Sequence, residues 1–338
     1  MARRVVTVPA LFVATAALLV LSPVLALVAG ALDLARRARG APTVRLLAFA
    51  SAYLAYESAG VLAAAWLWVT RPWHPGRWHE RNHRLQRWWT AGLVRAAGPV
   101  LGLRLEVEQQ GPPSPGPLVV ASRHVSVVDS LLPAHLLGVQ AGMRLRYVLT
   151  SGLQLDPCLD IVGHRLPNHF LDRRSTDRDR ERAALEHLAT GLGPGEAVVI
   201  FPEGGLFSPA RRDRAVARLA ERGSPRLATA RSLRNVLPPR PAGTLALLRA
   251  APDADVAVVA HRGFEPLASL RRLWRALPLT EPVRLRVVHH PRATVPDDDD
   301  GRVRWLDDQW TAMDRWLSGG SPAGLAFVRP GGDAEQGG

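Results

Sequence analysis

Two long apolar runs at the N-terminal end constrain the fold more than any other feature of the sequence. The run Val5–Leu32 contains no charged residue, and the run Leu46–Val69 contains only Glu57. A helix over the first run would be about 40 Å long, whereas the hydrocarbon core of a bilayer is about 30 Å thick. A cleaved signal peptide is shorter and is not followed by a second run. We therefore expect a membrane element of two helices, about 5–32 and 46–69, within residues 1–75. A buried helical hairpin in a soluble protein is the alternative.

Arginines flank both apolar runs and bear on the membrane topology. They are Arg3 and Arg4 before the first run, Arg36, Arg37, Arg39 and Arg45 between the runs, and Arg71, Arg77 and Arg81 after the second. Two full spans would place the middle group outside, against the positive-inside tendency. A monotopic hairpin, in which Pro9 and Pro23 let the first helix bend, keeps every group in the cytoplasm. The hairpin is favoured, and two spans stay open.

A stretch rich in tryptophan and arginine begins at the end of the second run. It holds six of the ten tryptophans, which are Trp66, Trp68, Trp73, Trp78, Trp88 and Trp89. Such rings at the end of an apolar run are typical of a membrane–water interface. Residues 76–98 are therefore predicted to form an amphipathic helix lying among lipid headgroups. The alternative is an ordinary surface helix of the soluble domain.

The charge balance indicates an anionic partner. The chain has 43 basic and 30 acidic residues, a formal net charge of +13, and every basic residue is arginine. Nucleic acid and anionic lipid both suit this charge, but the apolar N-terminal runs favour lipid, so no nucleic-acid partner is expected. The single cysteine, Cys158, excludes a disulfide framework and a thiolate metal cluster.

After Gly98 the pattern changes to short apolar runs that alternate with helical stretches. The expected strands are Leu103–Gln109, Pro117–Ala121, Leu145–Leu149, Ala197–Phe201, Asp255–Ala260 and Val283–Val288, and the clearest helices are Val127–Leu137, Arg178–Thr190 and Arg302–Leu317. This alternation predicts an α/β domain over residues 99–317, with a mixed, mostly parallel sheet flanked by helices. Residues 152–163 read as a loop, and residues 318–338, rich in glycine and proline, as a flexible tail.

One candidate site residue, His124, directly follows the predicted strand Pro117–Ala121. Asp129 stands five positions later, so the two form a His-x4-Asp motif. Open α/β folds build their sites at the carboxyl ends of strands, which is where His124 is expected. Asp129 would hydrogen-bond the imidazole and leave the other ring nitrogen free to accept a proton from a hydroxyl. The alternative is a local pair that only stabilises the helix start.

A second motif, Phe-Pro-Glu-Gly, ends the buried strand Ala197–Phe201 and contains Glu203 and Gly204. Its proline ends strand pairing, and glycine allows backbone to approach a ligand closely. Glu203 is expected at the same sheet edge as His124. By itself the motif is equally consistent with a tight turn and a solvated carboxylate.

Together these motifs resemble the glycerolipid acyltransferase family, which contains the lysophosphatidate acyltransferases. The family's signature is His-x4-Asp, Phe-x-x-Arg, Phe-Pro-Glu-Gly and an apolar strand, in that order. The second block matches Phe170-Leu-Asp-Arg173 and the fourth matches Asp255–Ala260. The resemblance covers about residues 101–317, and the N-terminal helices fit it too.

The resemblance implies roles for individual residues. His124 would be the general base and Asp129 the carboxylate that orients it, while Arg173, Glu203 and Gly204 would bind the acceptor phosphate or shape its pocket. A planar guanidinium suits phosphate because it makes paired, charge-assisted hydrogen bonds. The donor would be an acyl-CoA or acyl carrier protein thioester, which is already activated, so no cofactor and no metal are expected.

The sequence departs from the family pattern at three places. Arg123 stands where asparagine is usual, Gly205-Leu206 where Thr-Arg is usual, and Ala242 where a basic residue is usual. These changes leave the base and its partner intact but remove expected phosphate ligands. The missing charge could come from any one of four arginines, which are Arg123, Arg211, Arg212 and Arg240.

The expected function is therefore acylation of a lysophospholipid, above all of 1-acyl-sn-glycerol-3-phosphate to phosphatidic acid, as in phospholipid biosynthesis. The expected location is the bacterial cytoplasmic membrane, with the catalytic domain facing the cytoplasm and an anionic bilayer surface as partner. Another lysophospholipid or glycolipid acceptor is one alternative. A catalytically silent peripheral membrane protein on the same fold is the other.

Overall fold

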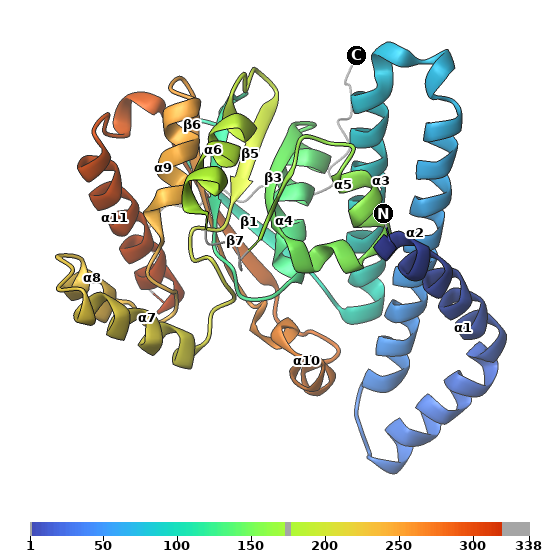
Figure 1. The fold of residues 1–338 in the computed structure, drawn as a ribbon. Helices are drawn as coiled ribbons and strands as arrows, with labels where there is room; N and C mark the ends of the chain where they lie inside the picture. Colours follow the sequence, from blue (N-terminus) through green and yellow to red (C-terminus); the bar gives the residue numbers. More distant parts are fainter. Residues whose placement is uncertain (1, 173–176, 320–338) are drawn as a thin grey trace, which may run out of the picture.

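Three long helices form one side of the molecule. The computed structural model describes residues 2–172 and 177–319. Helices α1 (Ala2–Ala35) and α2 (Pro42–Val69) form an antiparallel hairpin, and α3 (Trp78–Leu101) runs back along α2 (Figure 1). Both hairpin helices are long and apolar enough to cross a membrane, by length and composition. The Asp33 carboxylate accepts hydrogen bonds from the amides of Thr43 and Val44, which otherwise lack partners at the start of α2.

The remaining part of the chain is built on a seven-stranded sheet with the order β1-β7-β6-β2-β5-β3-β4. The strands are β1 (Leu105–Gln110), β2 (Leu118–Ser122), β3 (Arg144–Thr150), β4 (His169–Leu171), β5 (Glu196–Ile200), β6 (Asp255–Arg262) and β7 (Val283–His290). Every neighbouring pair is parallel except β6 and β7, which are antiparallel. The prediction of a mixed, mostly parallel sheet is confirmed.

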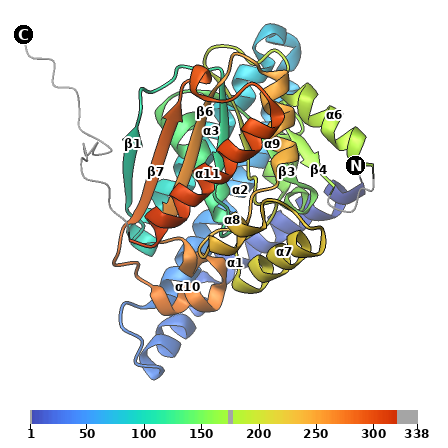
Figure 2. The same cartoon turned by 90° about the vertical axis from the view of Figure 1, so that its left-hand side faces the viewer.

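Helices cover both faces of the sheet, and the central strands are buried on both sides. In β2, Leu118 and Val120 pack in a core with the segment that follows the His-x4-Asp motif, whereas Val119 packs on the opposite face with Leu185 and Leu247. This alternation is the two-residue period of a strand. Figure 2 shows α9 and α11 in front of the sheet and α3 behind it. The shorter and outer helices are α4 (Leu131–Pro133), α5 (Pro157–Gly163), α6 (Arg178–Ala189), α7 (Pro209–Glu221), α8 (Leu227–Ser232), α9 (Pro241–Ala250), α10 (Leu270–Ala276) and α11 (Asp299–Leu317).

The hairpin is attached to the sheet domain at three levels. Near the start of α1, Arg4 forms an ion pair with Asp160 of α5, with Nε 2.6 Å from the carboxylate. In the middle of α2, the buried Glu57 accepts the Cys158 amide of α5 at 3.2 Å, and its other oxygen accepts the Trp89 indole of α3 at 2.8 Å. At the hairpin turn, the Trp274 indole of α10 donates to the Thr43 hydroxyl at 2.8 Å.

The structure corrects several local predictions. Residues 157–163, expected in a loop, form helix α5, because the Asp156 carboxylate accepts the Leu159 amide and Pro157 starts the helix without needing a bond for its nitrogen. Strand β4 was not predicted. The predicted helix Val127–Leu137 is a 3₁₀ turn, a short α segment and a π-helix that ends at Gln140. Residues 320–338, predicted as most of a flexible tail, lie outside the described residues.

Candidate active site

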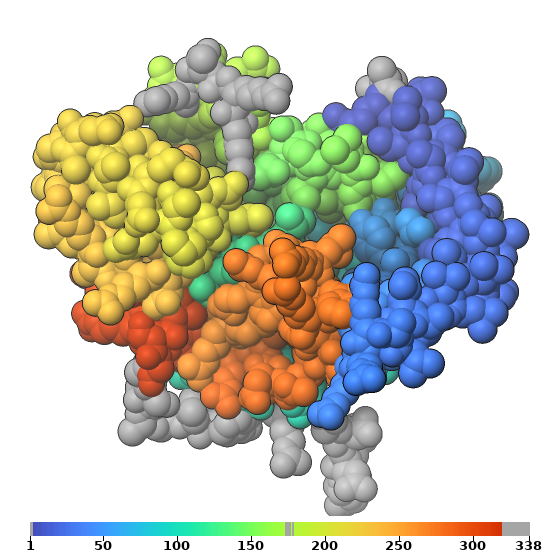
Figure 3. Space-filling view, turned by 90° about the horizontal axis from the view of Figure 1, so that it is seen from below, coloured from blue at the N-terminus to red at the C-terminus, as the bar shows by residue number. Residues whose placement is uncertain are grey.

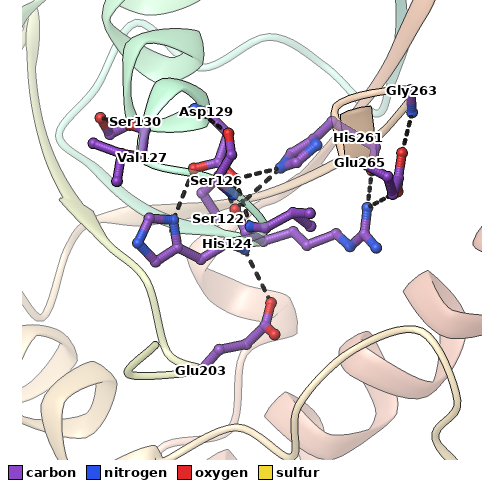
Figure 4. Close-up of polar contacts among 12 residues, drawn as sticks. Ser122, His124, Ser126, Val127, Asp129, Ser130, Glu203, His261, Gly263 and Glu265 are labelled. Atoms are coloured by element: carbon purple, nitrogen blue, oxygen red, sulfur yellow. Dashed lines mark hydrogen bonds and ion pairs between the residues drawn. The ribbon is translucent and has the colours of Figure 1, made fainter. Parts of the chain in front are cut away.

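Adjacent parallel strands bring the motif residues to one edge of the sheet. Strand β2 lies between β5 and β6 and is parallel to both, so their carboxyl ends coincide. His124 follows β2, Glu203 follows β5, and His261 lies near the end of β6. Figure 4 shows Asp129 between the rings of His124 and His261, with the Glu203 carboxylate directed at the His124 backbone amide. Residues far apart in sequence thus form a single site.

The His124 imidazole is held by Asp129. Its Nδ1 lies 2.7 Å from Asp129 Oδ1, and the carboxylate is fully buried. The second oxygen, Oδ2, accepts the amides of Val125 at 2.5 Å and Ser126 at 2.8 Å. Burial alone would raise the pKa of Asp129, but hydrogen bonds from His124 and His261 hold that pKa well below its usual range. An ionised carboxylate only accepts, so Nδ1 of His124 carries the hydrogen and Nε2 has a free lone pair.

Glu203 supports the backbone on either side of the site. Its Oε1 accepts the amide of His124 at 3.0 Å and its Oε2 accepts the amide of Leu237 at 2.9 Å. Burial raises the pKa of Glu203 to about 8, although the two amide donors and the Arg123 charge lower it. The Glu203 carboxyl group, which follows β5, therefore joins the segment after β2 to the segment before α9.

A cavity of about 660 Å³ opens beside His124. Phe201 packs its ring against the imidazole, with centroids 4.5 Å apart, and forms part of the wall. The arginines that line the cavity are Arg182, Arg211, Arg214, Arg218 and Arg240. Among the described residues, Arg214 and Arg218 form no ion pair with a carboxylate. These arginines make the cavity suited to an anionic ligand. Figure 3 looks onto the face of the molecule that carries α7 in yellow, α10 in orange and the hairpin in blue.

Gly204 and Arg240 lie against each other in this cavity. Gly204 has a φ of 63°, and a Cβ added there would come within 3.1 Å of Arg240 Cδ. Glycine thus satisfies both the left-handed backbone and the close approach of the arginine. The Arg240 amide also donates to the Pro202 carbonyl at 2.8 Å.

Two of the arginines considered from the sequence do not line the cavity. Arg123 is buried and bonds the Glu265 carboxylate at 3.0 Å and the Asn235 carbonyl at 3.0 Å, so it is not among the lining residues. Arg212 bonds the carbonyls of Leu233 and Arg231 instead. Arg173 lies outside the described residues.

Comparison with known proteins gives two similarities. Residues 104–259, which form most of the sheet domain, match the family model described as Acyltransferase. This match supports an acyltransferase domain in that part of the chain. The chain is also similar to the crystal structure of the 1-acyl-sn-glycerophosphate (LPA) acyltransferase PlsC from Thermotoga maritima. The sequence identity is 14%, the match covers 77% of this chain and 94% of that chain, and the TM-score is 0.45. The search of curated proteins gives no match.

The protein has a second, apolar cavity of about 210 Å³ next to the first. Leu149 lines both cavities. Val127 and Val128, which lie inside the His-x4-Asp motif, form one wall, and Tyr53 and Trp89 of the long helices form another. The apolar cavity thus lies between the N-terminal helices and the sheet domain.

One residue of the site was missed in the sequence. His261 Nε2 lies 3.4 Å from Asp129 Oδ2 and 3.2 Å from the Arg123 carbonyl oxygen (Figure 4). A polar residue directly after the predicted strand Asp255–Ala260 is a signal for the carboxyl edge of the sheet. The position of that strand beside β2, which the sequence does not reveal, is also needed to connect His261 with Asp129.

Proposed function

We propose that the protein transfers a fatty acyl chain from an acyl-CoA or acyl carrier protein thioester to the hydroxyl of a lysophospholipid. The preferred acceptor is 1-acyl-sn-glycerol-3-phosphate, and the product is phosphatidic acid. The observation that carries the proposal is the His124 imidazole, which has a free Nε2 beside an arginine-lined cavity and a buried carboxylate on its Nδ1.

The chemistry needs only this pair from the protein. His124 Nε2 takes the proton of the acceptor hydroxyl as its oxygen attacks the thioester carbonyl carbon. The new carbon–oxygen bond replaces the carbon–sulfur bond, and the thiol leaves with the proton that His124 returns. The Asp129 carboxylate stabilises the imidazolium that forms between the two transfers, as in the base half of a catalytic triad.

The two cavities suit the two parts of the substrates. Arginines such as Arg211 and Arg240 supply positive charge for phosphate groups of the acceptor and donor. The adjoining apolar cavity supplies a hydrocarbon environment for part of an acyl chain. Arg173, which the family resemblance assigns to the acceptor phosphate, stays a prediction.

The attachment of the hairpin favours a monotopic location on the cytoplasmic face of the bacterial membrane. Both ends of α1 contact the sheet domain, through Arg4 and Asp160 at one end and through Arg36, which lies over the Trp274 ring at 5.6 Å, at the other. A hairpin with its turn on the far side of a bilayer would lose the second contact. Exposed apolar side chains along α1, such as Val20 and Leu27, supply the surface that enters the lipid.

A different acceptor is the second candidate. Arg123 is directed away from the cavity, and Gly205 and Ala242 bring no charge to it. A lysophospholipid with another headgroup, or a glycolipid, would suit a cavity in which α7 rather than the family's usual positions provides the arginines. A catalytically silent protein is disfavoured, because a membrane-binding module has no use for a buried carboxylate aligned on an imidazole.

The test is an acyl-transfer assay with the full chain in membranes. Palmitoyl-CoA and palmitoyl-acyl carrier protein are offered as donors to lysophosphatidate, lysophosphatidylglycerol and a monoacyl glycolipid. We expect the fastest turnover with lysophosphatidate and none in the His124→Ala protein. Turnover of no acceptor, or equal turnover without His124, would overturn the proposal, and preference for the glycolipid would establish the second candidate.

A further inference from the structure

A second buried histidine lies directly behind the His124–Asp129 pair. His261 has no exposed surface, and its Nε2 lies between the Arg123 carbonyl oxygen at 3.2 Å and Asp129 Oδ2 at 3.4 Å. A carbonyl oxygen and an ionised carboxylate can only accept hydrogen bonds. The hydrogen of His261 is therefore on Nε2 and is shared between the two oxygens.

Among the described residues, Nε2 is the only atom of the His261 ring that makes polar contacts. Its Nδ1 is buried and has no hydrogen-bond partner among the described residues, and the edge of the Phe264 ring packs nearby, with centroids 5.4 Å apart. The backbone of His261 is fixed as well, because its carbonyl accepts the Arg123 guanidinium, which also bonds Glu265. The ring is thus held in one orientation, with Nε2 toward Asp129.

We propose that His261 is a positioning residue for acyl transfer, which acts through Asp129 on His124. The proposal rests on the proposed function only for its kinetic part. Asp129 Oδ2 accepts the amides of Val125 and Ser126, which leaves Oδ1 directed at the His124 ring, and His261 Nε2 lies 3.4 Å from the same Oδ2. A hydrogen bond to a buried charge keeps that carboxylate ionised. Without His261, Oδ2 keeps only its two backbone amides, so the buried carboxylate is held less firmly as the anion. A neutral carboxyl can donate to His124 Nδ1, which moves the ring hydrogen to Nε2.

Kinetic constants of three variants test the proposal. In His261→Leu, kcat is expected to fall about 10- to 100-fold, the range for loss of a hydrogen bond to a charged group, with KM for both substrates unchanged. His261→Gln, whose side-chain amide nitrogen takes the place of Nε2, is expected to recover most of kcat. His289→Leu, which removes a buried imidazole elsewhere in the sheet, is the matched control and is expected to keep wild-type kcat.

A double-mutant cycle separates positioning from a loss of stability. If His261 acts through Asp129, His261→Leu has little further effect on kcat in the Asp129→Asn protein, because the oriented carboxylate is already lost. The proposal would be overturned if His261→Leu lowered kcat by the same factor in the wild-type and the Asp129→Asn protein, or if His261→Leu alone kept wild-type kcat. A Gln variant as impaired as the Leu variant would overturn it too.

A spectroscopic measurement does not depend on the assigned reaction. Ring-nitrogen resonances of ¹⁵N-labelled histidine report which nitrogen of His124 carries the hydrogen. We expect a single Nδ1–H form in the wild type and a mixture of the two forms in His261→Leu. Unchanged His124 resonances in that variant would overturn the positioning role, whatever the acceptor proves to be. If the wild-type protein acylates no acceptor while the His124 resonances still change in His261→Leu, the result would count against the proposed function alone.

Discussion

Replacing Asp129 by asparagine tests the site most directly, because the structure determines how the amide must sit. Oδ2 of Asp129 accepts two backbone amides, from Val125 and Ser126, and Oδ1 accepts His124 Nδ1. Turning the new NH₂ group toward the two amides would leave buried donors facing each other, at about 1–3 kcal/mol for each lost bond. The NH₂ group is therefore expected to face His124.

In that orientation the amide donates to Nδ1, so the hydrogen of the ring moves to Nε2 and the base is lost. General-base catalysis is worth about 10²- to 10⁴-fold, which corresponds to roughly 3–5 kcal/mol of the barrier. We expect kcat to fall by this factor in Asp129→Asn, while KM for the acceptor changes little and the protein stays folded. The assay is steady-state acyl transfer with lysophosphatidate and palmitoyl-CoA.

The matched control is Asp314→Asn. Asp314 is also buried, and its Oδ1 accepts two successive amides, those of Arg234 and Asn235, but it does not line the cavity. The amide oxygen of asparagine can keep both bonds, so this variant is expected to retain kcat. A loss of kcat below about 10-fold in Asp129→Asn would refute the reasoning, because a wrong ring tautomer cannot coexist with general-base catalysis of the size given above. An equal loss in the control would refute it too.

Four further outcomes are expected. In Glu203→Gln the new NH₂ group faces one of the two amides that the carboxyl accepts, so unfolding should become easier by about 1–3 kcal/mol in a denaturant titration. Burial raises the pKa of Glu203 from 4.5 to about 8, so between these pH values the native state binds a proton that the unfolded state does not. The free energy of unfolding should therefore fall as pH rises from about 4.5 through about 8. An equal dependence of the unfolding free energy on pH in Glu203→Gln would contradict this. Arg214→Ala and Arg218→Ala should each raise KM for a phosphate-bearing substrate and make KM depend less on salt concentration. An unchanged KM would exclude the replaced arginine from substrate binding. The full chain should remain in membranes washed with about 1 M salt and need detergent for release, since burial of apolar surface is not screened; release by salt alone would show purely electrostatic attachment. Cysteine introduced at Arg37 should resist an impermeant maleimide in intact cells, with the buried Cys158 giving no background, and labelling would establish two spans.

Most of the sheet could be predicted because its central strands are continuous apolar runs buried on both faces. The six predicted strands all occur, and each end lies within two residues of its predicted position. Strand β4, His169–Leu171, was missed because three partly buried residues that pair only with β3 leave no period to detect. Helix α5 was missed because flanking glycines suggested a loop, although Asp156-Pro157 is a usual helix start.

The site was predictable where one short motif holds both partners. His124 and Asp129 are close in sequence, so their contact needs only a strand followed by a turn. Arg123 was expected near a phosphate, but successive side chains of an extended segment point to opposite sides, so the neighbour of His124 is directed away from the cavity. His261 depends on strand order, which no local pattern encodes.

The apolar cavity has a consequence for the proposed attachment of this protein to a bilayer. Phe49 and Tyr53 of α2, together with Trp89 of α3, form part of its wall, and Glu57 of α2 bonds the Trp89 indole. The proposed anchor and the space proposed for an acyl chain are thus formed by the same helices. Exchange of the hairpin for a lipid tail or a foreign membrane helix is therefore expected to leave one side of that cavity missing. On this proposal the hairpin is not a detachable module, and a water-soluble form requires new polar side chains on the outer face of α1 rather than its deletion.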